Sequence, residues 1–332
     1  MEAATRSTSV SQALAWLQSD EVVMEDGAVL SWSNPNHDGY AYPEIAGYLL
    51  NLLAQQPDSS PEIRRRIASR IARDVSPEGG VGRRGIRYVF DTGMVLTGLM
   101  AERKVAGELP DPDLPQRLFE FIATEIKARR AATAPTMGSG AHWSTTYGCH
   151  LLKMAQSISA YGDAFGDERA PALVNQLVAD LTPLAEDGRF RIHDHEDYSY
   201  LHSHCYALEG LAVIEAASPR GWLWPIIRRG ALWLGRIQDE SGGVRAHNNG
   251  FAAWGELRGD ATAQAVRIWS LVDRNAFAGE ISAATAFLQG LQTECGGYRY
   301  SPNSRDVNTW VTLFTTQALM WASEGGNARC VV

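Results

Sequence analysis

The sequence is poor in cysteine and has no uncharged run that suits a membrane helix. Its four cysteines, Cys149, Cys205, Cys295 and Cys330, lie far apart and form no C-x-x-C pair. This spacing argues against a disulfide framework and a structural zinc site, so we expect four free thiols. The longest stretch without Asp, Glu, Lys or Arg, residues 131–152, is too rich in Gly, Ser, Thr and His to cross a bilayer.

Excess positive charge and a targeting segment are missing as well. The chain has 30 Lys and Arg residues against 38 Asp and Glu residues, which gives a net charge of −8. Such a chain has no broad positive field to attract nucleic acid or an anionic membrane, so neither is an expected partner. The first residues lack the basic and apolar segments of a signal peptide, which predicts a cytoplasmic protein.

Common cofactor and nucleophile motifs are also absent. The sequence contains no P-loop, no H-E-x-x-H and no G-x-S-x-G. Residues 80–85 match G-x-G-x-x-G, but they follow a helical pattern rather than a strand, so they are expected to form a loop. We therefore expect no cofactor.

What the sequence does contain is a repeat with a period of about 50 residues. Each unit has an amphipathic helical pattern, a glycine turn, a loop rich in aromatic residues and a second, mostly apolar helical pattern. Glycine suits these turns because it adopts the positive φ that the end of a helix requires. The six turns are Asp26-Gly27, Gly79-Gly80, Gly138-Ser139-Gly140, Asp187-Gly188, Gly242-Gly243 and Gly296-Gly297.

The repeat predicts twelve helices in two layers. The first helices carry most of the charges and are expected at roughly residues 11–18, 61–75, 113–130, 170–185, 222–238 and 278–292. The second helices are apolar nearly all round and are expected at 45–53, 94–100, 151–155, 206–214, 261–271 and 311–320. They begin near Pro43, Asp91, Thr145, His202, Asp260 and Asn308, residue types that suit the first turn of a helix.

Six such hairpins form either an open solenoid or a closed ring. An open solenoid needs polar capping repeats, yet the last second helix is as apolar as those in the middle of the chain. We therefore predict an all-α protein, a single (α/α)6 toroid of six helical hairpins over residues 1–332. In a toroid, the loops that lead into the inner helices gather at one end and line a cup.

The candidate site residues lie in those loops and at the starts of the second helices. The predicted catalytic residues are Glu44, Asp91, Tyr147, His202 and His204. A histidine at a helix N-terminus favours the neutral form, which can act as a base near neutral pH. The predicted substrate-binding residues are Tyr42, Trp143, Trp254, Arg258, Asp260, Arg305 and Trp310.

Other roles for these residues remain open at this point. Each acid at a helix start also suits a helix cap, and the aromatic rings also suit a plug that fills the barrel. His193, His195, His202 and His204 form the densest histidine cluster, which is chemically able to bind zinc, copper or nickel. Residues two apart on a helix point about 200° from each other, so the helical pair offers one ligand to any point, and no metal is predicted.

Three segments resemble a known bacterial family. They are residues 42–48 (YPEIAGY), 89–99 (VFDTGMVLTGL) and 203–211 (SHCYALEGL). They resemble a family of (α/α)6 toroids of the terpenoid-cyclase and prenyltransferase-like type, some members of which accompany glycan-synthesis genes. This resemblance covers most of the chain in matching order and implies the toroid fold. The D-x-D-D motif of terpenoid cyclases is missing from the sequence.

A looser resemblance is to the N-acylglucosamine 2-epimerase and glucuronyl C5-epimerase toroids. The start of the fourth second helix, with His202, His204, Leu208 and Glu209, partly resembles the histidine motif of the former, which implies sugar epimerisation. The leading hypothesis is therefore an epimerase or isomerase that moves protons on a polar, carbohydrate-like small molecule. One alternative is a cyclase or transferase of secondary metabolism that acts on an apolar substrate. The other is a non-catalytic helical-repeat binding protein.

Overall fold

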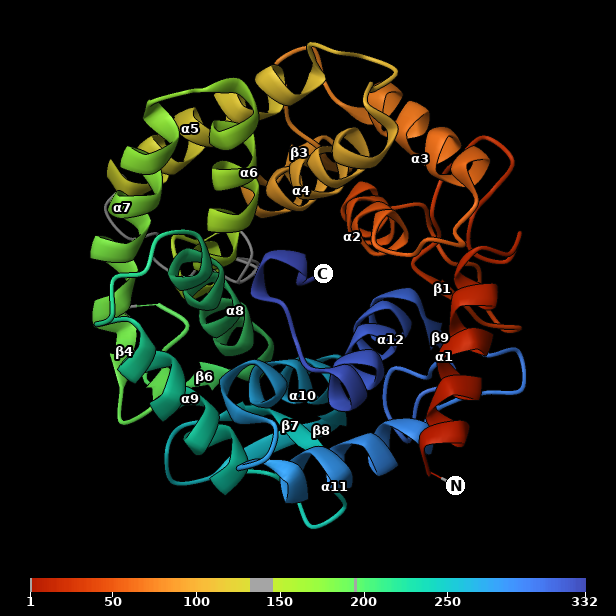
Figure 1. Ribbon diagram of the computed structural model, residues 1–332, viewed down its shortest axis with the longest axis vertical. Helices are drawn as coiled ribbons and strands as arrows, with labels where there is room; N and C mark the ends of the chain where they lie inside the picture. Colours follow the sequence, from red (N-terminus) through yellow and green to blue (C-terminus); the bar gives the residue numbers. More distant parts are fainter. Residues whose placement is uncertain (1, 132–145, 194–195) are drawn as a thin grey trace.

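The computed structural model describes residues 2–131, 146–193 and 196–332, and over these ranges it contains twelve α-helices in two concentric rings (Figure 1). The outer helices are α1 (Glu2–Leu17), α3 (Pro61–Asp74), α5 (Leu114–Ala131), α7 (Arg169–Leu181), α9 (Trp224–Arg236) and α11 (Ala278–Gln289). The inner helices are α2 (Pro43–Ala54), α4 (Val89–Ala106), α6 (Ala155–Phe165), α8 (Leu201–Ala217), α10 (Gly259–Asp273) and α12 (Thr309–Glu324). The last inner helix packs against both α1 and α2, which closes the ring. The predicted all-α toroid is confirmed.

The two layers differ in burial as their sequences require. In the inner helix α8, every residue from Leu201 to Ile214 is buried, whereas the outer helix α3 buries only one face, formed by Arg64, Ile67, Ala68 and Ile71. Backbones of neighbouring inner helices approach closely where both carry glycine. A Cβ atom on Gly98 in α4 would lie 2.2 Å from the Gly47 oxygen in α2. The inner ring is therefore packed backbone against backbone at this point.

The helix boundaries depart from the predicted ranges in a consistent way. Outer helices α3, α5, α9 and α11 lie within a few residues of the prediction, but α1 begins at Glu2 and α7 already ends at Leu181. Except for α6, the inner helices begin earlier than predicted, and all of them run past the predicted ends, because the polar and small residues at their ends continue the helix. The third inner element begins with a 3₁₀ turn, η2 (Cys149–Met154), and residues 138–140 and 145, where a turn and a helix start were predicted, lie outside the described ranges.

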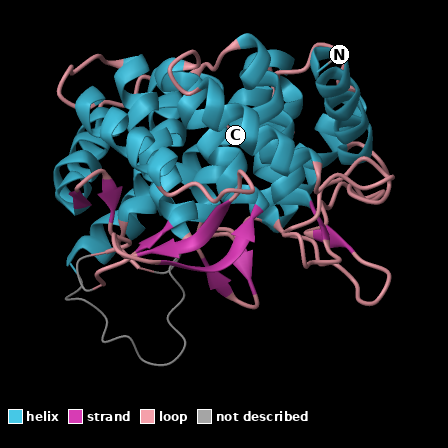
Figure 2. Ribbon diagram, turned by 90° about the horizontal axis from the view of Figure 1, so that it is seen from below, coloured by secondary structure: helices cyan, strands magenta, loops and turns pink. Residues whose placement is uncertain are grey.

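Short strands occupy the loops that lead into the inner helices, and Figure 2 shows them gathered at one end of the helices. A three-stranded antiparallel sheet consists of β6 (Ser199–Tyr200), β7 (Val244–Asn248) and β8 (Ala253–Arg258). Two hairpins are formed by β2 (Gly82–Arg83) with β3 (Ile86–Arg87) and by β4 (Ala185–Glu186) with β5 (Arg189–Phe190). Strand β1 (Trp32–Ser33) pairs with β9 (Val307–Asn308), which joins the first loop to the last one.

The last residues of the chain lie inside the ring, where Figure 1 shows the C-terminus at the centre. Val331 and Val332 are fully buried after a 3₁₀ turn, η4 (Ala328–Cys330). The side-chain amides of Asn51 and Gln156 donate to the Val331 oxygen, at 3.0 and 2.7 Å. Because these partners come from different inner helices, the segment fills the middle of the barrel.

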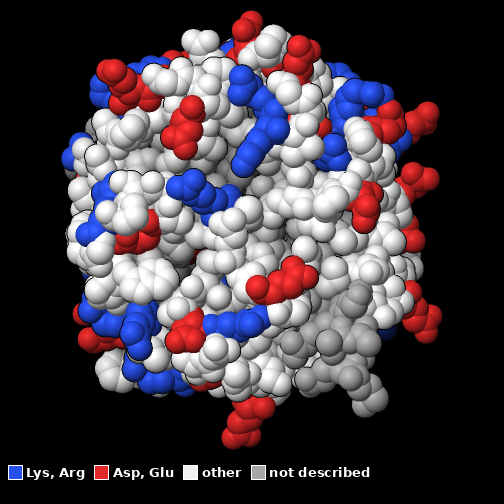
Figure 3. All heavy atoms as spheres, viewed as in Figure 1, with Lys and Arg blue, Asp and Glu red and all other residues white. Residues whose placement is uncertain are grey.

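The opposite end of the ring from the strands carries a second cavity, of about 630 Å³. Figure 3 views this end, where Lys and Arg side chains border a hollow. Arg103, Lys104, Arg329 and Cys330 are among its lining residues. All four cysteines are free, as predicted. Within the described residues, every helix is too short or too polar to cross a membrane.

Candidate active site

A pocket of about 460 Å³ opens at the end of the ring where the short strands lie. Its walls come from the first turns of α2, α4, α8, α10 and α12 and from the loops before them. Eight aromatic residues line it: Trp32, Tyr40, Tyr42, Tyr88, Phe90, Tyr200, Tyr300 and Trp310. Acidic, basic and histidine side chains lie between these rings, so the pocket offers both stacking faces and proton-transfer groups.

Two carboxyl groups lie side by side on one wall. Glu44 belongs to the first turn of α2 and Asp91 to the first turn of α4, and their residues are 8% and 4% exposed. Trp310 Nε1–H donates to Glu44 Oε2 at 3.1 Å, and the Tyr42 hydroxyl donates to Asp91 Oδ2. Each carboxyl group thus keeps a fixed orientation, and both are largely removed from water.

Burial shifts the protonation of this pair. It raises the pKa of Asp91 to about 7, against the opposing effect of the Tyr42 hydrogen bond. Burial, with the neighbouring charge of Asp91, raises the pKa of Glu44 well above its ordinary value. Both carboxyl groups therefore keep a proton to higher pH than exposed acids do, and Asp91 titrates near neutral pH.

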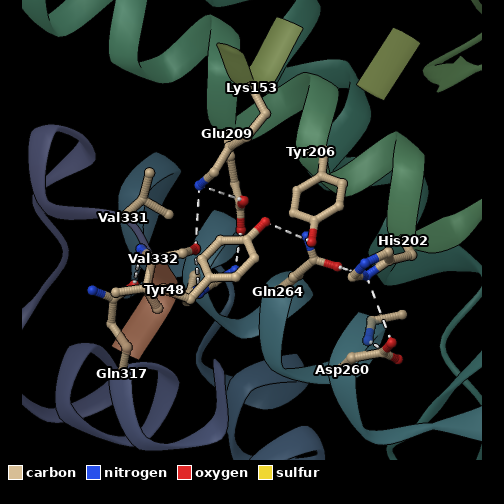
Figure 4. Close-up of polar contacts among 12 residues, drawn as sticks. Tyr48, Lys153, His202, Tyr206, Glu209, Asp260, Gln264, Gln317, Val331 and Val332 are labelled. Atoms are coloured by element: carbon tan, nitrogen blue, oxygen red, sulfur yellow. Dashed lines mark hydrogen bonds and ion pairs between the residues drawn. The ribbon is translucent and has the colours of Figure 1, made fainter. Parts of the chain in front are cut away.

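Across the ring, α8 and α10 present a second polar group (Figure 4). Arg258 Nε donates to Asp260 Oδ1 at 3.0 Å, and a second guanidinium nitrogen donates to Oδ2. Burial disfavours the Asp260 charge, but Arg258 and His202 outweigh it and hold the pKa of this carboxyl below its ordinary value. Asp260 is therefore ionised, and its charge is matched by Arg258.

His202 lies beside this ion pair at the start of α8. Its Nδ1 lies 2.7 Å from Gln264 Oε1 and 3.7 Å from Asp260 Oδ2 (Figure 4). An amide oxygen accepts, so the proton is on Nδ1 and Nε2 is the basic nitrogen. Burial lowers the pKa of His202 to about 4, although Asp260 opposes this effect. The imidazole is therefore neutral at pH 7, which is the form that a general base requires.

The pocket brings together seven of the twelve predicted site residues. These are Tyr42, Glu44, Asp91, His202, Arg258, Asp260 and Trp310. The structure places Tyr147, Trp254 and Arg305 elsewhere: Tyr147 donates to Asp180 Oδ2, Trp254 lies on β8 and Arg305 is exposed. Trp143 lies outside the described residues.

The rim position expected for His204 is corrected by the structure. His204 is fully buried, accepts a hydrogen bond at Nδ1 from the Phe190 backbone, and packs edge-on against Trp233 of α9. Burial lowers its pKa to about 3. Because it is two residues from His202 on the same helix, it points away from the pocket and toward the outer ring.

Several lining residues were not among the predicted site residues. Arg83 stacks over the Tyr40 ring, and Asp306 accepts a hydrogen bond from Asn34 at 2.6 Å. Asn308 caps α12 by accepting from the Val311 backbone. The pairing of β1 with β9 brings these distant loops together, and nothing local in the sequence signals that pairing.

The histidine cluster is divided by the fold. His193 is buried in the loop before β6, His202 lies at the pocket and His204 points outward. His195 lies outside the described residues. Among the residues that the structure describes, no three His, Cys, Asp or Glu side chains come together in a group able to hold a metal ion.

No family model and no curated protein matches this sequence. Solved structures do match over nearly the whole chain. A sugar epimerase from a ruminal bacterium has a TM-score of 0.72 at 9% identity, over 96% of this chain and 99% of its own. The unsaturated glucuronyl hydrolase of Bacillus sp. GL1, described as responsible for glycosaminoglycan degradation, has a TM-score of 0.70 at 12% identity, over 96% and 97%. The α-1,6-mannanase GH76A of Salegentibacter has a TM-score of 0.67 at 13% identity, over 96% of this chain and 99% of its own. At these identities the shared property is the (α/α) toroid fold.

Proposed function

We propose that this protein is an enzyme that moves protons on a carbohydrate-like small molecule, in the manner of an epimerase or isomerase. The observation that carries the proposal is the buried pair Glu44 and Asp91, which faces His202 across an aromatic-walled pocket. Perturbed titratable groups that converge in a cleft are typical of catalytic sites. The three similar structures named above, which are described as carbohydrate-active enzymes, support the same class.

The protonation states suggest a division of roles. His202 Nε2 removes a proton from a carbon atom of the substrate, and Glu44, in its protonated form beside Asp91 on the opposite wall, donates a proton to the same carbon. Removal of a proton from one face of this carbon and return of a proton to its opposite face invert the stereocentre. The number of protons on the substrate is unchanged. Arg258 and Asp260 hold each other, so their contribution is to fix Tyr200 and the local field around His202 rather than to grip the substrate.

The lining chemistry favours a polar substrate over an apolar one. Four carboxyl groups, two arginines and a histidine lie among the aromatic rings. A purely apolar ligand would displace water from these groups and give no partner to the polar atoms that the protein itself does not satisfy, at a cost of about 1–3 kcal/mol for each atom left unpaired. A sugar has both hydroxyl groups for these partners and C–H faces for the rings.

Incubation in deuterated water tests the proposal. Aldoses, amino sugars, uronic acids and short oligosaccharides are incubated with the protein and analysed by NMR and mass spectrometry. We expect deuterium to enter at least one carbon position, and Glu44→Gln or Asp91→Asn to slow this by about 10²–10⁴-fold. Glu62→Gln is the matched control, because Glu62 is an exposed acid on α3. Absence of uptake across all four classes contradicts the epimerase proposal; release of reducing ends without uptake would indicate a hydrolase instead.

A further inference from the structure

We propose that an aromatic platform beside the pocket binds an oligosaccharide chain that extends out of the site. The platform consists of Tyr198 just before β6, Tyr200 on β6, His247 on β7 and Trp254 on β8, and Phe251 lies at the tip of the β7–β8 hairpin. This inference rests on the proposed function for its ligand class, because it assumes that the pocket holds a sugar unit. It adds that the substrate is an oligosaccharide and that binding extends beyond the pocket.

The platform is continuous with the pocket wall. Tyr200 lines the pocket, and its ring centroid lies 5.2 Å from that of His247 on β7. His247 in turn stacks on Trp254 of β8, with 5.4 Å between centroids and 10° between ring planes. Tyr198 flanks both rings, at 5.7 and 6.0 Å. A chain of rings therefore leads from the pocket onto the outside of the sheet.

The outer part of the platform is exposed in a way that packing does not explain. Phe251 at the hairpin tip is 97% exposed and Trp254 is 42% exposed. Residues 253–256 of β8 are all exposed, so this edge strand covers no core. Large rings on an exposed sheet edge carry an aggregation risk, and adjacent exposed apolar groups commonly mark a binding surface.

The hairpin tip is held rigidly. The Asn248 side chain accepts from the Gly250 backbone at 2.6 Å, and the Asn249 side chain accepts from Phe251 and Ala252 at 3.1 and 2.9 Å. Gly250 has φ +90°, which a side chain would strain. The Phe251 backbone therefore has a fixed position before any ligand binds, which reduces the entropy lost on binding.

The chemistry of the platform suits a sugar chain. Its rings are separated by polar edges, such as the His247 imidazole and the Glu256 carboxylate, which accepts from Ser301 at 2.6 Å. A pyranose has an apolar C–H face that stacks on a ring and hydroxyl groups that bind such edges. A chain anchored in the pocket that follows these rings would place an outer unit on the exposed Trp254 ring, which His247 supports from its other face.

The test measures affinity as a function of chain length. Isothermal titration is performed with gluco-, manno- and uronate series, from monosaccharides to hexasaccharides, on the wild type and on Trp254→Ala. We expect affinity to rise with length in at least one series, and Trp254→Ala to weaken the longer members about tenfold while leaving the monosaccharide unchanged. Trp254→Phe should restore most of the loss, because it restores a ring.

The chain offers a matched control. Trp222, 50% exposed, precedes α9 at the end of the ring away from the strands, so Trp222→Ala should bind every member like the wild type. Equal affinity for all lengths, no binding in any series, or an equal loss in both tryptophan variants would overturn the platform. Deuterium uptake without a length effect leaves the catalytic proposal standing and removes the platform. A length effect without deuterium uptake supports the platform and contradicts the catalytic proposal.

Discussion

Glu44 and Asp91 are neighbouring buried carboxyl groups, and the protonation of Asp91 changes the charge of the pocket. Burial raises the pKa of Asp91 from 3.8 to about 7, so the folded protein binds this proton more tightly than the unfolded chain does. Below about pH 4, Asp91 is protonated in both the folded and the unfolded protein, so it does not change the free energy of unfolding. Between about pH 4 and pH 7 only the unfolded state ionises readily, so the folded state loses stability as the pH rises.

Asp91→Asn removes this titration while keeping an acceptor for the Tyr42 hydroxyl. We expect the melting temperature of the variant to exceed that of the wild type increasingly from pH 4 to pH 7, by several degrees at the upper end, and then to level off. Thermal denaturation followed by circular dichroism measures this. A constant difference across the pH range would show that Asp91 titrates normally.

At the scale of single residues, the sequence identified pocket acids better than pocket histidines. Glu44, Asp91 and Asp260 share the first turn of an inner helix, a position that the repeat marks clearly. His202 and His204 share that turn too, but only His202 faces the pocket. The rotation of α8 about its axis decides between them. That rotation is set by packing against α9 and Phe190, which the sequence does not encode locally.

At the scale of elements, the contact between α2 and α4 fixes the distance between the two carboxyl groups. Gly98→Ala would place a Cβ atom 2.2 Å from the Gly47 oxygen, so the helices must separate. We expect a loss of about 3 kcal/mol in the free energy of unfolding. Gly279→Ala in α11 is the matched control, since nothing lies within 4 Å of its Cβ position, and it should gain about 0.5–1 kcal/mol.

Urea denaturation of both variants provides the comparison. If Gly98→Ala and Gly279→Ala shift the midpoint equally, the close approach of the two inner helices is not essential for stability. If Gly98→Ala alone is destabilised and its folded fraction also loses activity, the spacing of Glu44 and Asp91 depends on this contact.

The sequence predicted the helices well because the two layers differ strongly in hydrophobic pattern. It did not predict the hairpin of β7 and β8. Residues 253–256 of β8 are exposed on both faces, so they lack the alternation that marks a half-buried strand. The same property that hides the strand from sequence analysis makes it available as a binding surface.

At the scale of the molecule, the closure of the helical ring could be predicted from the sequence, but the C-terminal segment that fills its centre could not. The apolar last helix indicated a closed toroid, and α12 does contact α1 and α2. The burial of Val331 and Val332 inside the barrel depends on partners from five different helical elements: α2, η2, α6, α10 and α12. Sequence periodicity describes each helix separately, so a segment that is bound by all of them together leaves no periodic signal.

These last residues complete a buried polar cluster. Lys153 Nζ donates to Glu209 Oε2 at 3.0 Å and to the Val332 oxygen at 3.2 Å, and Arg267 donates to the same two groups (Figure 4). All three charged side chains are fully buried. Two cations against one carboxylate need the Val332 oxygen as a partner, because an unpaired buried charge is strongly destabilising.

Deletion of residues 327–332 should therefore destabilise the entire inner ring rather than one end of it. We expect a loss of several kcal/mol, in the range of about 3–5 kcal/mol for a buried ion pair that loses a partner, and faster hydrogen exchange in α8, α10 and α12 together. Arg329→Ala is the control, because Arg329 is exposed and its guanidinium donates to the Ala216 oxygen rather than to the buried cluster. Tyr48 and Tyr206 are joined by a 2.8 Å hydrogen bond and lie between this cluster and His202. The deletion should therefore also increase the mobility of the residues around His202. An unchanged melting temperature and unchanged exchange would mean that water satisfies Lys153 and Arg267 once the segment is gone, and that the barrel is stable without its centre.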